Sequence, residues 1–111
     1  MTKRIAVGRI EDIPTRGSRV VETALGPVAL FRTSDDHLFA LVNRCPHKGG
    51  PLSEGILHGH KVTCPLHNWV IDLASGDAEA PDHGCTRSIP LEVVAGVVHL
   101  DLPASAAVCH G

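Results

Sequence analysis

The stretch that decides the architecture runs from residue 45 to residue 67 and reads CPHKGGPLSEGILHGHKVTCPLH. Its two ends, CPH (45–47) and CPLH (64–67), each combine a cysteine, a proline and a histidine. Thiol and imidazole groups at such spacing are typical metal ligands. Neither end has the period of a strand or a helix. Both are therefore predicted to be irregular loops, which is where proteins usually place binding chemistry.

The chain on either side of these loops has the pattern of an antiparallel β protein. Short apolar or alternating segments are separated by turn residues, and they cover 20–23, 28–31, 38–42, 60–63, 89–93 and 98–102. Period-two alternation places one face of a strand inward and the other in water. Ala95-Gly96 and Ser34-Asp35-Asp36 suit hairpin turns. No helical stripe is evident beyond a single turn near residues 11–13, so an all-β sandwich or barrel is predicted.

The length and composition indicate one small domain. The 111 residues are 43% hydrophobic and 20% charged, which is ordinary for a globular protein. We expect a single domain over residues 1–111, with the metal-binding part at about 43–76 and a fraying tail at about 103–111. A net charge of −2, together with an aromatic content of 3% that includes no tyrosine, argues against nucleic acid as a partner.

The sequence predicts a cytoplasmic address without a membrane partner. Residues 1–9 lack the apolar core of a targeting segment, and no apolar window approaches the length of a membrane span. In a reducing compartment, the four cysteines are better explained as metal ligands or thiols than as disulfides.

The spacing of the ligands distinguishes between two kinds of metal centre. In a C-x-H segment the two side chains point the same way about 7 Å apart, which suits two metals of one cluster better than two corners of a single tetrahedron. A [2Fe–2S] centre with two cysteines on one iron and two histidines on the other is the Rieske arrangement. A structural zinc site, in an interaction module without a redox role, is the alternative. Both use the same four residues, Cys45, His47, Cys64 and His67.

The neighbouring residues fit a cluster. Pro46 and Pro65 each follow a candidate cysteine ligand, fixing the turn and removing one N–H. Gly49, Gly50 and Gly55 allow a close approach of the backbone, so that other N–H groups reach cluster sulfurs.

Residues 45–76 resemble the Rieske family, whose loops read C-P-H-x-x-G and C-P-L-H. The resemblance implies that Cys45 and Cys64 bind one iron of a [2Fe–2S] cluster, and that His47 and His67 bind the other near the surface. It also implies the Rieske fold, an antiparallel β-sandwich with a small cluster-binding subdomain made of the two loops.

Within that family, residues 64–73 (CPLHNWVIDL) are most similar to the small subunit of assimilatory NAD(P)H-dependent nitrite reductase. Residues 52–56 and the Gly84-Cys85 pair before Ile89-Pro90 share this similarity, which extends over about residues 3–102. It implies one-electron transfer beside a large flavin- and sirohaem-containing subunit that reduces nitrite to ammonium. The second interpretation is a ferredoxin of a ring-hydroxylating dioxygenase, partnered by an oxygenase and its reductase. In neither is the isolated chain expected to be catalytic, because each iron already has four ligands.

Two departures from the respiratory Rieske proteins predict a low reduction potential. Those proteins carry an additional cysteine on each loop, at the positions of Gly50 and Leu66, and hydroxyls where this chain has Trp69 and Ile71. Fewer hydrogen-bond donors near the sulfurs destabilise the reduced cluster. No metal-binding role is assigned to Cys85 and Cys109, which are read as thiols, or to His37, His58, His60 and His99, which are read as solvent-side residues; His83 stays unassigned.

Overall fold

The structure is a computed structural model that describes residues 3–24, 26–43, 51–65, 69–79, 86 and 88–102. The elements in chain order are β1 (Lys3–Arg9), η1 (Ile10–Asp12), β2 (Gly17–Thr23), β3 (Gly26–Arg32), β4 (Leu38–Val42), η2 (Leu52–Glu54), β5 (Ile56–His58), β6 (Lys61–Thr63), β7 (Val70–Asp72), β8 (Leu91–Val94) and β9 (Val97–Leu102). Strand pairing among them is antiparallel throughout, which confirms the all-β prediction.

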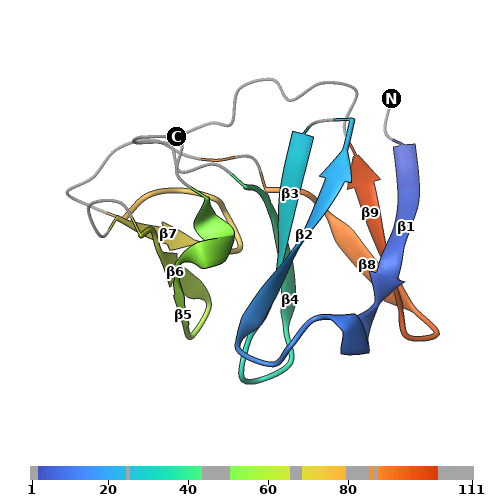
Figure 1. Cartoon of the computed structure of the whole chain (residues 1–111), viewed down its shortest axis with the longest axis horizontal. Coiled ribbons are helices and arrows are strands. Elements are labelled where there is room, and N and C mark those ends of the chain that lie inside the picture. The colour runs from blue at the N-terminus through green and yellow to red at the C-terminus, as the bar shows by residue number, and fades with distance from the viewer. Residues whose placement is uncertain are drawn as a thin grey trace.

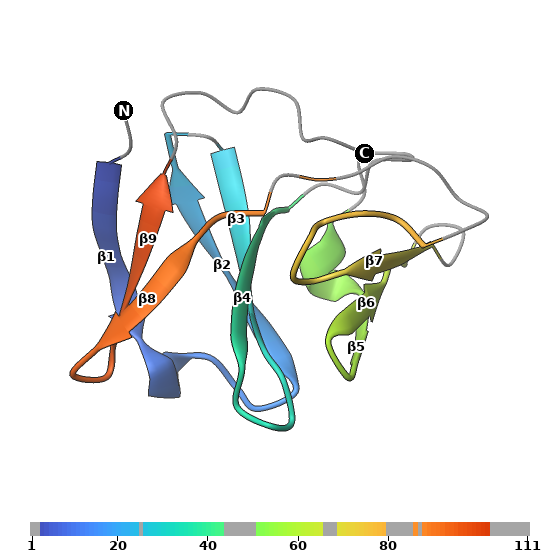
Figure 2. The ribbon, with the colours of Figure 1, turned by 180° about the vertical axis from the view of Figure 1, so that it is seen from behind.

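The strands of the described residues form three layers (Figure 1). One outer sheet has the order β1-β9-β8, the middle sheet the order β2-β3-β4, and the second outer sheet the order β5-β6-β7. The view from behind shows the same arrangement, with the small β5-β6-β7 sheet beside β4 (Figure 2). The first two sheets are the predicted sandwich. The small sheet stands where the cluster-binding subdomain is expected.

Strand β3 is buried on both faces because it lies in the middle layer. Val28 and Leu30 face a core shared with the β1-β9-β8 sheet, whereas Ala29 and Phe31 face a second core shared with the small sheet. The second core continues through Leu41, Leu52, Val62, Cys64, Ile71 and Leu73. The small sheet is therefore attached to the sandwich by continuous apolar packing, which makes it a stable platform for the two loops.

The β8–β9 hairpin forms at the predicted place. Ala95 and Gly96 make its turn with φ values of 51° and 79°. The inward set of β9 is buried as its alternation predicts, namely Val98, Leu100 and Leu102. The alternation over residues 89–93 predicts Val93 on the inward face, but Val93 is exposed, because β8 is an edge strand and its turn end lacks a neighbour on one side.

Helical structure in the described part of the chain is limited to short 3-10 turns. Element η1 overlaps the single turn predicted near residues 11–13, and η2 begins the return from the first loop. Among the described residues, no helix has the length and apolar character needed to cross a membrane.

Candidate metal centre

The second loop begins at Cys64, directly after β6. The Cys64 N–H donates a hydrogen bond to the Trp69 carbonyl oxygen at 2.7 Å, one step beyond the last β6–β7 pair, Thr63 with Val70. This bond continues the ladder to the base of the loop. Cys64 is therefore held in a fixed position, whereas His67 lies outside the described residues.

Cys64 is shielded from water by the second core. It is fully buried, in the same cluster as Leu52 and Ile71, and Trp69 packs against this cluster while remaining partly exposed. A thiolate is unfavourable in such apolar surroundings unless a cation neutralises it. A bound metal supplies that charge and keeps a coordinating thiol deprotonated. The chemistry of the site thus suits Cys64 as a ligand on the protein side of a metal centre.

The two ends of the first loop are tied together by Asn43, which follows β4, and Ser53, which lies in η2. The Ser53 N–H donates to Asn43 Oδ1 at 2.8 Å, and Asn43 Nδ2 donates to Ser53 Oγ at 3.1 Å. The hydroxyl of Ser18 in β2 donates to the Ser53 carbonyl oxygen at 2.7 Å. Cys45 and His47 lie between these ends, outside the described residues. The stem of their loop is therefore anchored to the middle sheet.

Replacing Asn43 with alanine should lower the free energy of unfolding by about 1–3 kcal/mol, because the half-buried Ser53 N–H loses its acceptor. Chemical denaturation of the apo-protein measures this loss. Ser53→Ala is the matched control, since it removes one side-chain hydrogen bond and keeps the bond from the backbone N–H. A Ser53→Ala loss equal to or larger than that of Asn43→Ala would contradict this account of the stem.

Gly55 brings the stems of the two loops side by side. A Cβ atom at this position would lie 2.3 Å from the Thr63 carbonyl oxygen and 2.9 Å from Val62 Cγ2. Its φ of −77° is open to any residue, so the requirement for glycine comes from the close contact. The exit of the first loop therefore lies against the end of β6, one residue before Cys64. The stems of the two loops therefore converge, as a cluster bound by both loops requires. The described residues fit the expected [2Fe–2S] cluster.

The structure places two more residues from the sequence prediction. Ile71 is fully buried in β7, paired with Val62, and is part of the second core. Trp69 lies at the base of the second loop with its ring against that core. Gly50 and Leu66, together with Cys85, His83 and Cys109, are outside the described residues.

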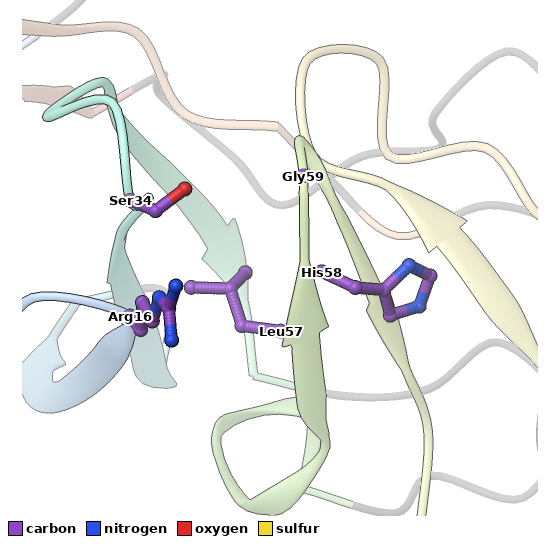
Figure 3. A pocket seen from close by; sticks show the side chains of 5 residues that line it. All are labelled: Arg16, Ser34, Leu57, His58 and Gly59. Atoms are coloured by element: carbon purple, nitrogen blue, oxygen red, sulfur yellow. The ribbon is translucent and has the colours of Figure 1, made fainter.

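A shallow pocket of about 270 Å³ lies between the sandwich and the β5–β6 hairpin. Figure 3 shows Leu57 pointing toward Arg16 and Ser34, whereas the His58 ring points to the opposite side of β5. His58 Nε2 instead makes a 2.7 Å hydrogen bond with Thr63 Oγ1. Ser34 and His58 therefore do not form a nucleophile–base pair.

One group of polar residues was missed by sequence reasoning. Asp35 and His37, in the β3–β4 turn, meet His60 of the β5–β6 turn. The pKa of the Asp35 carboxyl is held well below its usual range by the Thr33 hydroxyl and also by His60 and His37. The histidines are exposed as predicted. Their association has no signature in the sequence, because it depends on how two separate sheets pack.

Comparison with known proteins identifies the family. Residues 3–90 match the Rieske [2Fe-2S] domain. The chain is 38% identical over 77 residues to the anthranilate 1,2-dioxygenase ferredoxin subunit of Burkholderia cepacia, covering 68% of this chain and 70% of that subunit. It is 35% identical over 74 residues to human apoptosis-inducing factor 3, covering 67% of this chain but 12% of that protein. The chain thus spans only a small part of some relatives that it matches.

Solved structures agree with this fold. A protein of Mycobacterium tuberculosis, assigned as the small subunit of an NADH-dependent nitrite reductase, superposes with a TM-score of 0.83 at 21% identity over 94% of this chain and 98% of its own. A chain in the complex of reduced oxygenase and oxidised ferredoxin of carbazole 1,9a-dioxygenase gives 0.79 at 26% identity, over 88% of this chain and 92% of its own.

The family match also decides between the two kinds of metal centre. A Rieske domain carries a [2Fe–2S] cluster, so the cofactor is an iron–sulfur cluster of the Rieske type and not a structural zinc ion. The antiparallel sandwich, the small sheet and the converging loop stems are the framework that such a cluster needs. This chain belongs to the Rieske [2Fe–2S] family of electron-transfer domains.

Proposed function

We propose that this chain serves as the electron-transfer small subunit of an NAD(P)H-dependent assimilatory nitrite reductase in the cytoplasm. In this proposal Cys45 and Cys64 bind one iron, and His47 and His67 bind the other. When bound, the cluster supplies reversible uptake of one electron. The partner is a large subunit that carries flavin and sirohaem and reduces nitrite to ammonium. The isolated chain is not itself catalytic.

The described residues of the chain hold the stems of the two loops in position and shield Cys64 from water. Cys64 lies in a water-excluded core, and the hydrogen bond from its N–H to Trp69 fixes the base of the second loop. The Asn43–Ser53 pair does the same for the first loop. Stems that are held on a packed sheet in this way favour the same ligand geometry in both oxidation states, which favours rapid electron transfer.

The observation that carries the choice of partner is the segment 64–73, CPLHNWVIDL, which resembles nitrite reductase small subunits. Of the described residues of this segment, Trp69 packs against the second core, and Ile71 is fully buried within it. The superposition on the M. tuberculosis protein supports the fold that this choice requires.

A ferredoxin that serves a dioxygenase is the second candidate. It is favoured by the sequence relative from B. cepacia, which is a ferredoxin subunit of such a system and is matched over most of its length. In this alternative the cluster and its four ligands are unchanged, and the partner is an oxygenase with its reductase.

We expect a reduction potential toward the low end of the Rieske range of about −150 to +300 mV. Ile71 is buried in an apolar core and Trp69 offers only an indole N–H, so neither supplies a hydroxyl to the cluster sulfurs. A redox titration followed by electron paramagnetic resonance measures the potential. A value near the upper end would show that other donors compensate and would refute this explanation.

Reconstitution separates the two candidate partners. The cluster-loaded chain is added to the flavin and sirohaem subunit of its source organism, and NAD(P)H oxidation that depends on nitrite is recorded. The same chain is added to a dioxygenase with its reductase, and oxygen uptake that depends on an aromatic substrate is recorded. Stimulation of nitrite reduction alone supports the first proposal. Stimulation of oxygen uptake alone replaces it with the second.

A further inference from the structure

Three exposed polar groups meet where the β3–β4 turn faces the β5–β6 turn. His37 Nδ1 lies 2.9 Å from Asp35 Oδ2. His60 Nε2 lies 2.9 Å from the same oxygen and 3.2 Å from Asp35 Oδ1. One ligand atom from each of the three residues lies within 4.8 Å of the other two. The group therefore joins the middle sheet of the sandwich to the small sheet.

We propose that Asp35, His37 and His60 form a binding site for a divalent transition-metal ion of the zinc type, separate from the cluster loops. Two imidazoles and one carboxylate are ligands that such ions accept, with water completing the coordination. The inference does not depend on which redox partner the chain serves.

The distances are close to those that zinc requires. Tetrahedral ligands at about 2.0–2.1 Å from the metal are separated from one another by about 3.3 Å. The three ligand atoms lie between 2.9 Å and 4.8 Å apart, so side-chain movements of about 1 Å assemble the site. The side chains of Asp35, His37 and His60 are 54%, 61% and 43% exposed, which leaves them free to make these movements.

The Asp35 carboxylate is oriented by a hydrogen bond from the Thr33 hydroxyl. Thr33 is fully buried; its hydroxyl donates a hydrogen bond to Asp35 Oδ1 and accepts one from the backbone N–H of His37 at 3.0 Å. This contact leaves Asp35 Oδ2 directed at the two imidazoles. The neighbouring Asp36 is committed elsewhere, to an ion pair with Arg32 at 3.0 Å. Such outer hydrogen bonds orient metal ligands and strengthen binding.

An aromatic ring supports the two histidines. The Phe39 ring centroid lies 5.2 Å from that of His60 and 6.5 Å from that of His37, and the two imidazoles are 4.8 Å apart. His60 is also fixed through its backbone, because its carbonyl oxygen accepts the Leu73 N–H at 3.0 Å. An ion at this site would link the hairpin that leads to Cys64 to the sandwich.

The test uses the cluster-loaded protein, because its cysteine and histidine cluster ligands are then occupied. After treatment with a chelator that leaves the visible spectrum intact, the protein is titrated with Zn²⁺ alone and followed by calorimetry and metal analysis. We expect one zinc ion per chain in addition to the iron. At a free zinc concentration of 100 times the dissociation constant, the midpoint of thermal unfolding should rise by about 10 °C.

Variants locate the ion. His37→Ala and His60→Ala should weaken zinc binding by about 10-fold or more, and Asp35→Asn, which keeps the side-chain volume, should do the same. His58→Ala is the matched control: this histidine is exposed on the same hairpin but bonds to Thr63, and its loss should leave the affinity unchanged. Zinc binding that survives equally in all four variants would overturn the proposal, as would a wild-type protein that takes up no zinc.

Discussion

Replacing Cys64 with serine should remove the cluster from the chain. Cys64 is the candidate ligand that the structure describes, and it lies fully buried at the end of β6. A serine oxygen is a harder and less polarisable ligand than a thiolate and suits an iron–sulfur centre poorly. The two irons of the centre should fall to near none per chain, with loss of the visible spectrum and of the resonance signal.

The matched control for this prediction is Cys109→Ser, since Cys109 lies beyond the residues that match the Rieske domain. It should retain the full iron content. Circular dichroism of both apo-proteins shows whether the Cys64 variant still folds, so that lost iron is not confused with unfolding. A folded Cys64→Ser protein with a complete visible spectrum would contradict the ligand assignment.

The second large effect is expected from Gly55→Ala. The new methyl group would lie 2.3 Å from the Thr63 carbonyl oxygen, and backbone on both sides prevents a simple side-chain adjustment. Such overpacking costs about 3 kcal/mol of the free energy of unfolding or slightly more. It also pushes the exit of the first loop away from β6. We therefore expect lower iron content per chain as well as a lower denaturation midpoint.

Gly59→Ala provides the comparison for this steric effect. A Cβ atom at Gly59 meets nothing within 4 Å, and its φ of 57° costs an alanine only about 1 kcal/mol of backbone strain. Iron content should be unaffected. If Gly59→Ala destabilised the chain as much as Gly55→Ala, then the close contact between the two loop stems would not be what requires glycine at position 55.

The sequence predicts the features of this protein that depend on local pattern. The alternation of Val98, Leu100 and Leu102 predicts β9, and the Ser34-Asp35-Asp36 turn predicts the β3–β4 hairpin. The two loop motifs predict the family, because cysteine and histidine at that spacing are rare without a metal. Assignment of Cys45, His47, Cys64 and His67 as ligands stays a prediction, and of these four residues only Cys64 is among the described ones.

Features that depend on packing between sheets were not predictable. Nothing local distinguishes Asp35 from Asp36, yet one faces two imidazoles and the other pairs with Arg32. The exposure of Val93 has the same explanation. The alternation around Val93 is regular, but the sequence does not reveal that its strand lies at the edge of a sheet. Likewise, the apolar run in β3 does not reveal which of its residues pack into which of the two cores.

The double burial of β3 constrains how the length of this strand can change during evolution. Val28 and Leu30 belong to one core, and Ala29 and Phe31 to the other. Side chains alternate between the two faces of a strand, so a one-residue insertion or deletion would exchange both sets at once. In an outer strand with one face in solvent, the same insertion or deletion would misplace only the one set of side chains that packs into a core. Length changes among natural relatives should therefore gather in the exposed turns and spare β3.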